Sequence, residues 1–278
     1  MIGGRCQRKL SGSSTSIAAS KVPELTAVFW VTKALITGAS EWWPDYFYRR
    51  FGLVVVTGVL VAVLVAALAL QFNVRRNHAW IFWLAFGVAS VAAKEAANGE
   101  HRVLGFSYVF VVVFWFVVLT AILVSWRASG ETLAPGSVYT RRQELFYWAA
   151  IGSGFALSAA AGHASADLGF SYLRGELLVV AALTATIALA WWRFNLNPVL
   201  AFWLAFVLTG PLGGGLASWM ATGRSAGGLG LGRWPVSLCL TIAVVGLVAC
   251  MAVSRRETWP GAPSACVRNT GVPDQTKD

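Results

Sequence analysis

The chain has 278 residues, of which 57% are hydrophobic and 12% carry a formal charge, with 14 tryptophans and a net charge of +10. A soluble globular domain carries about 25% charged residues, so this composition excludes an ordinary soluble protein and favours a surface that faces lipid. A positive net charge can indicate a nucleic-acid partner, but the distribution of the charge along this chain indicates a membrane protein and no nucleic acid.

Long uncharged runs identify the membrane-spanning segments. Four of them cover residues 51–70, 103–126, 194–223 and 234–254. About 20 apolar residues span the bilayer core as a helix, and a spanning segment is helical because lipid offers no partner to backbone N–H and C=O groups. The sequence therefore predicts an all-α polytopic membrane protein.

Short motifs recur along the chain at matched offsets. Phe-Trp-Leu-Ala-Phe occurs at 82–86 and 202–206, and Gly-Phe-Ser-Tyr occurs at 105–108 and 169–172. The second motif starts 22 residues after Trp83 and 21 residues after Trp148. Self-similarity at a fixed period is the signature of a repeat architecture, so we expect four copies of a two-helix repeat.

In chain order, we expect a disordered cytoplasmic tail at 1–22, an eight-helix membrane domain at 23–255 and a second disordered cytoplasmic tail at 256–278, since both tails are polar. The eight transmembrane helices are expected at about 24–41, 51–71, 79–96, 103–126, 143–162, 171–192, 197–219 and 234–254. The repeats run over about 24–72, 78–127, 143–193 and 197–255. An even number of helices in each repeat makes the repeats parallel, related by an axis along the membrane normal or by translation.

The orientation follows from the positive charges. Fourteen Lys and Arg residues fall in the tails and in the loops after the even helices, against seven on the other side, and Lys33 lies within the first helix. Cytoplasmic segments carry the excess of Lys and Arg, so both termini are expected in the cytoplasm. Lys33 is expected to extend to the cytoplasmic interface, the alternative being a contact with a substrate. The repeated tryptophans are expected to lie in the interfacial belt.

A polar residue follows the repeated tryptophan by fifteen positions in every copy. The four residues are Asp45, Asn98, His163 and Ser218. Fifteen residues of helix extend about 22 Å, so these side chains are expected near the external end of each odd helix. One interpretation is a polar ring around a shared vestibule or cation site; the other is four ordinary turn and cap residues in headgroups or water.

Further charges accompany this candidate ring. Glu41 precedes Asp45 by four residues, and Asp167 follows His163 by four, which places each pair on one helix face. Asp45, His163 and Asp167 are the candidates for a metal site or a proton relay, against hydrogen-bonded helix ends. Glu41 and Lys94 each follow their tryptophan by eleven residues, so an ion pair between the first two repeats is expected.

The seventh expected helix contains a Gly-Pro-Leu-Gly motif. Gly210, Pro211 and Gly213 are the candidates for a helix break, because proline removes a backbone hydrogen bond. Broken helices often line the solute sites of transporters.

These features resemble a known family. The resemblance rests on four features: Lys21-Val22-Pro23-Glu24 before Phe29-Trp30, the fourfold tryptophan repeat, Gly-Pro-Leu-Gly at 210–213 and Gly-Gly-Leu-Gly-Leu-Gly at 227–232. In these features the chain resembles an uncharacterised membrane-anchored family of bacterial inner-membrane proteins. The resemblance covers about 21–255. It implies a bacterial source and four tandem two-helix repeats, with no known activity. The family tends to carry an acid at the turn of each repeat. Asp45 fits, whereas Asn98, His163 and Ser218 differ, and Gly210 stands where Arg is expected.

Three functional hypotheses follow. The first is a transporter or channel for a small solute or cation, and the second is an accessory or scaffold subunit that associates with itself or with another membrane protein. The third, a membrane enzyme or haem protein, has little support because only His163 is an intramembrane histidine and no nucleotide-binding loop or zinc motif is present. We therefore expect a protein that is not an enzyme and has no cofactor.

Overall fold

The computed structural model describes residues 22–23, 25–74, 78–131, 133, 138–167, 193 and 197–257. Every regular element in these ranges is helical. They are α1 (Ala27–Ala39), α2 (Trp43–Phe51), α3 (Leu53–Asn73), α4 (Ala79–Arg102), α5 (Tyr108–Ala128), α6 (Arg141–Asp167), α8 (Pro198–Ala221), the 3-10 turn η1 (Arg224–Ala226) and α9 (Arg233–Glu257). The predicted helix at 171–192 and the tails at 1–21 and 258–278 lie outside the described residues.

Six of the described helices are long and apolar enough to cross a membrane. They are α3, α4, α5, α6, α8 and α9. Together they indicate a multi-pass helical membrane protein. α1 has only 13 residues, fewer than the roughly 20 that a single helix needs to span the bilayer core.

The first helix differs from its prediction. The expected helix at 24–41 is shorter, and an additional helix, α2, follows it after a tight turn at residues 40–42. Pro44 lies in the first turn of α2, where its missing N–H and fixed φ are tolerated. Gly52, with φ +80°, then reverses the chain into α3, a conformation that glycine adopts at no steric cost.

Local capping explains where several other helices begin. Thr140 and Gln143 form a reciprocal capping box at the start of α6, in which Gln143 N–H donates to Thr140 Oγ1 and Thr140 N–H donates to Gln143 Oε1, both at 3.1 Å. Ser107 caps α5 and Asn197 caps α8 by accepting a backbone N–H.

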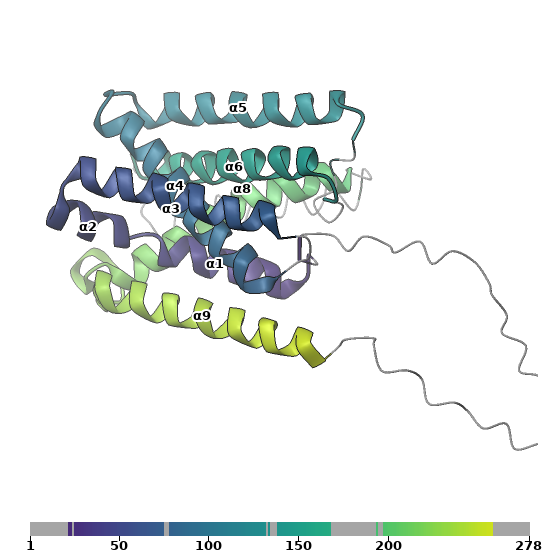
Figure 1. Cartoon of the computed structure of the whole chain (residues 1–278). Coiled ribbons are helices and arrows are strands. Elements are labelled where there is room, and N and C mark those ends of the chain that lie inside the picture. The colour runs from purple at the N-terminus through teal and green to yellow at the C-terminus, as the bar shows by residue number, and fades with distance from the viewer. Residues whose placement is uncertain are drawn as a thin grey trace, which may run out of the picture.

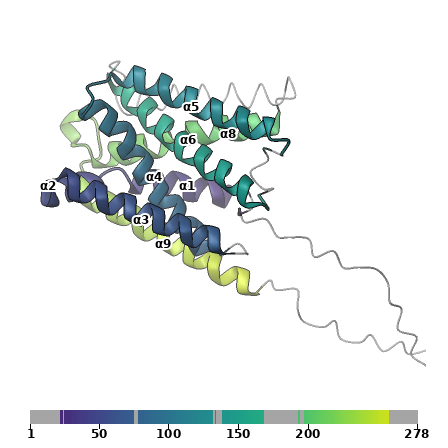
Figure 2. The same cartoon turned by 45° about the horizontal axis from the view of Figure 1, so that its top comes forward.

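The helices form an inner ring and an outer layer (Figures 1 and 2). α1 packs on α4, α4 on α6, α6 on α8 and α8 on α1, which closes the ring. α3, α5 and α9 lie outside it and pack mainly on α4, α6 and α1 respectively. The inner helices run in one direction and the outer ones in the other, so α1 begins and α9 ends on the same side (Figure 1).

The two layers differ in how much of their apolar surface is buried inside the protein, as a membrane environment requires. In the most apolar 18-residue stretch of each helix, only 6% of α3 and 11% of α9 is buried inside the protein, against 56% of α4 and 61% of α6. Large aliphatic side chains such as Val54 and Val245 point outward. The apolar side chains of the outer helices therefore cover the outside of the bundle, where lipid solvates them.

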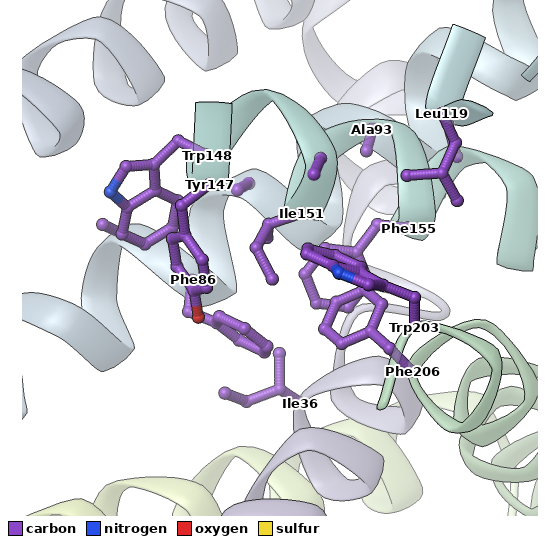
Figure 3. Packing of buried hydrophobic residues seen from close by; sticks show 14 of the residues in the cluster. Ile36, Phe86, Ala93, Leu119, Tyr147, Trp148, Ile151, Phe155, Trp203 and Phe206 are labelled. Carbon is purple, nitrogen blue, oxygen red and sulfur yellow. The ribbon is translucent and has the colours of Figure 1, made fainter. Parts of the chain in front are cut away.

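An aromatic core fills the half of the inner ring where α1 begins, because the first turns of the inner helices carry its rings. Figure 3 shows part of this packing. Phe86 is fully buried and lies 4.9 Å from Phe155 and 6.0 Å from Phe29 and Phe206, measured between ring centroids. Trp83, Trp148 and Trp203 belong to this core. The predicted interfacial position for these tryptophans is therefore wrong, because their rings are buried against phenylalanines of the core instead of facing headgroups.

Candidate functional site

A polar cavity occupies the opposite half of the inner ring, near the C-terminal ends of α4, α6 and α8. Its volume is about 280 Å³. All four members of the candidate ring line it: Asp45 from α2, Asn98 from α4, His163 from α6 and Ser218 from α8. Residues that are far apart in sequence thus meet at one site, as a shared vestibule requires.

An ion pair crosses the cavity wall between α4 and the turn after α1. Lys94 Nζ lies 2.6 Å from Glu41 Oε2 and also donates to the backbone oxygen of Glu41 at 3.1 Å. Both side chains are largely shielded, with 9% and 13% of their surface exposed. The ion pair expected from the equivalent repeat positions is present, and its position in the structure shows a second role.

That second role is to supply a hydrogen bond to a backbone carbonyl at the break between α1 and α2. α1 ends at Ala39 and α2 begins at Trp43, so carbonyl groups near the turn lack the intrahelical partners they would have in a continuous helix. Ser40 Oγ donates to Thr37 O, and Lys94 donates to Glu41 O. A cation beside the C-terminus of a helix is also favourable for the helix dipole, so Lys94 stabilises the broken segment that lines the cavity.

A second charge cluster lies at the cavity rim. Arg102 is 3.6 Å from Asp45 and 3.9 Å from Glu95. Tyr48 of α2 also forms a side-chain hydrogen bond with Glu95. Arg102 is half-exposed, so these pairs contribute little to stability, but they neutralise both carboxylates of the rim.

Asn98 and His163 are joined through an aromatic residue. The Tyr108 hydroxyl donates to Asn98 Oδ1 at 3.3 Å, and the Tyr108 ring stacks on both His163 and His101, with centroids 4.9 and 4.0 Å apart. Asn98 Nδ2 in turn donates to Glu95 Oε1 at 3.4 Å. Tyr108 therefore positions two of the four ring members from the start of α5.

The candidate metal ligands do not assemble into a site. Asp167 is exposed near the end of α6 and does not line the cavity, while Asp45 is paired with Arg102. Across the described parts of the chain, no group of three His, Cys, Asp or Glu side chains could hold a metal ion.

The predicted break at Gly210, Pro211 and Gly213 is wrong, because α8 continues as one helix from Pro198 to Ala221. Pro211 cannot donate to Val207 O, its partner in a regular helix. The hydroxyl of Ser158, from α6, donates to that carbonyl at 2.7 Å instead. A polar side chain from a neighbouring helix therefore satisfies the group that proline frees, and the helix persists.

The glycines of this motif allow close helix packing. A Cβ at Gly210 would overlap the Ser158 hydroxyl, and a Cβ at Gly213 would overlap the backbone oxygen of Ala34 on α1. Gly210 and Pro211 line the cavity, as does Gly214, whose Cβ would lie 3.2 Å from Glu41 Oε2. Small residues at helix interfaces permit such contact in membranes, and here they also leave space for the cavity.

Lys33 does not reach the cytoplasmic interface, contrary to the sequence-based prediction. Its side chain is fully buried in the middle of α1, with Nζ 4.3 Å from the centroid of the Phe206 ring and 5.4 Å from that of Phe155. It points into the ring because Phe29, Lys33 and Thr37 recur at helical spacing on the inner face of α1.

Sequence reasoning missed several residues of the site. Glu95, Arg102, Ser158 and Arg233 all line the cavity. Arg102 follows Asn98 by four residues, a spacing that places both on one helix face, so periodicity could have identified it. The partnership of Ser158 with Pro211 depends on the crossing of α6 and α8, for which the sequence contains no local signal.

No protein-family model matches the chain, and no curated protein or solved structure matches it either.

Proposed function

We propose that this chain is a transporter or channel for a small solute, and that the solute occupies the polar cavity. The observation that carries the proposal is the convergence of Asp45, Asn98, His163 and Ser218 on one cavity. If these residues were ordinary helix ends in headgroups, they would have no reason to meet. Polar groups inside a membrane domain most often mark a solute or ion pathway.

The broken segment at residues 40–42 supports the same proposal. Transporters use discontinuous helices to present backbone groups at their solute sites. Here Ser40, Glu41 and Trp42 line the cavity, so the discontinuity expected in the seventh helix is found between α1 and α2 instead.

We further propose eight spans arranged as four parallel repeats around an axis along the membrane normal. The α1–α2 segment would be the first span. The closed order α1, α4, α6, α8 supports cyclic repeats, as does the packing of each described outer helix against the inner helix of the next repeat. The positive-inside asymmetry supports the further proposal that both termini lie in the cytoplasm of a bacterial inner membrane and that the cavity opens outward.

The test is solute flux into proteoliposomes that contain the full chain. Gly214→Leu places a side chain in the cavity, whereas Gly246→Leu places the same side chain on α9, where a Cβ meets nothing within 4 Å. We expect wild type and Gly246→Leu to pass one solute class at least tenfold faster than Gly214→Leu, at equal reconstitution and melting temperature.

A membrane accessory or scaffold subunit is the alternative function. It is favoured by the wide apolar groove of about 970 Å³ on the outer face, lined mainly by residues of α3, α4 and α9, with others from α1 and α2. Equal, background-level flux for the wild type and both glycine variants would contradict the transport proposal and favour this alternative.

A further inference from the structure

Lys33 is the most unusual charged residue of the described chain. Its side chain is fully buried, and its Nζ has no hydrogen-bond partner among the described residues. Its neighbours are the faces of Phe155 and Phe206. Rings of this kind attract a cation, but they do not accept the three hydrogen bonds that an ammonium group can donate.

Packing alone does not explain a lysine at this position. An unpaired charge in a membrane interior is strongly unfavourable, and ionisable residues there usually pair or mark function. An apolar side chain of similar length would fill the same slot between the two rings without that penalty. The amine of Lys33 therefore needs a role that an apolar side chain could not fill.

The position of Lys33 links it to the cavity. Thr37, one turn further along α1, lines the cavity, and its hydroxyl donates to Lys33 O at 3.0 Å. Phe155 also lines the cavity, and its ring lies beside Lys33 Nζ. Lys33 therefore lies about one helical turn deeper than the cavity wall, roughly 6 Å along α1, at the junction with the aromatic core.

The charges of the cavity wall determine which ligand would suit this site. Among the described lining residues, Glu41, Asp45 and Glu95 balance Lys94, Arg102 and Arg233. Each of these carboxylates already lies within 4 Å of Lys94 or Arg102. A cation would find no unpaired carboxylate there, whereas Lys33 offers an amine that no described side chain pairs and that a bound anion would keep protonated.

We propose that the solute of this cavity is a small anion, and that Lys33, one helical turn below the cavity wall, neutralises its negative group. This inference rests on the proposed transport function and specifies its substrate class. The volume of about 280 Å³ equals that of about nine water molecules in the liquid. The cavity therefore suits inorganic anions and short carboxylates, not drug-sized ligands.

The test uses acetate, lactate, phosphate and chloride as sodium salts, with glycerol as a neutral probe and the potassium salts of the same anions as the test for a cation effect. Ligand-dependent melting of the purified full chain gives binding, and proteoliposome flux gives transport. Lys33→Met keeps an unbranched side chain that packs well against aromatic rings, so this variant should fold. Arg127→Met removes a positive charge from the end of α5, outside the cavity lining, and is the matched control.

We expect at least one anion to stabilise wild type and Arg127→Met. Its half-saturating concentration should rise tenfold or more in Lys33→Met, with a parallel loss of flux. The inference is overturned if no anion of the panel binds, or if Lys33→Met binds and passes the same solute as wild type does. In that second case the transport function stands and only the substrate class is wrong. Both proposals fail if no probe crosses wild-type proteoliposomes faster than those with Gly214→Leu.

Discussion

The two halves of the inner ring are built from the same helices but serve opposite physical purposes. In the half where α1 begins, Phe29, Phe82, Phe86, Phe202 and Phe206 are buried against one another and leave little space. In the other half the same helices enclose a polar cavity. The comparison shows that this scaffold separates a tightly packed aromatic region from a polar cavity along the length of its helices.

The difference follows from side-chain size along each inner helix. The first turns carry the aromatic pairs, whereas the later turns carry glycine, alanine and serine, as at 158–162 in α6 and at 213–215 and 217–218 in α8. Large rings fill the space between helices, and small residues do not. Charged groups can then occupy the emptier half, provided that they are paired.

The largest expected effect is in the polar half. Lys94→Met should destabilise the protein by about 3–5 kcal/mol, because it leaves Glu41 shielded from water without its partner. Unfolding in detergent monitored by tryptophan fluorescence measures the loss. The double variant Glu41→Gln with Lys94→Met should recover most of it, since no unpaired charge remains. A single-variant loss below about 1 kcal/mol would show that solvent already screens the pair.

The next effect sharpens the contrast from the aromatic half. Phe86→Ala should cost about 3 kcal/mol, the lower end of the usual range for such truncations, because burial from lipid lacks the transfer term that water supplies. Phe86 is fully buried and contacts rings from α1, α6 and α8. Solute affinity should stay within about threefold of wild type, measured by ligand-dependent melting. A large loss of affinity would mean that the two halves are coupled.

A smaller effect is expected where the halves meet. Gly210→Ala should destabilise by about 1–3 kcal/mol, as overpacking does, because the added Cβ overlaps the Ser158 hydroxyl. Equilibrium unfolding of the variant measures this loss. The matched control is Gly87→Ala on α4, where a Cβ meets nothing within 4 Å. Equal stability of the two variants would contradict the close crossing of α6 and α8.

The smallest effect concerns the hydrogen bond that replaces the one lost at Pro211. Ser158→Ala removes the donor to Val207 O and should cost about 0.5–1.5 kcal/mol. In combination with Gly210→Ala the two changes should be non-additive, because the first removes the atom with which the second collides. A double-mutant cycle on unfolding free energies tests this, and strict additivity would contradict the contact.

Part of the site could be predicted from sequence because it depends on spacing. The fifteen-residue offset from each tryptophan identified one cavity residue on each of α2, α4, α6 and α8, and the equivalence of Glu41 and Lys94 predicted their ion pair. The first helix was expected to end at about residue 41 and ends at Ala39, but the helix α2 that follows it was not predicted. A proline in α8 is accommodated by Ser158 from another helix, whereas the turn at residues 40–42 is stabilised by Lys94 from α4.

The sequence by itself determined the helical membrane class and which helices are uniformly apolar, because lipid imposes length, hydropathy and internal hydrogen bonding on any spanning segment. Only the tertiary structure decided which faces of the mixed helices meet. It placed the tryptophans in a core instead of at the interface, buried Lys33 instead of exposing it, and left Asp167 outside the cavity. These outcomes depend on how helices rotate and cross, and contacts between distant residues set that geometry.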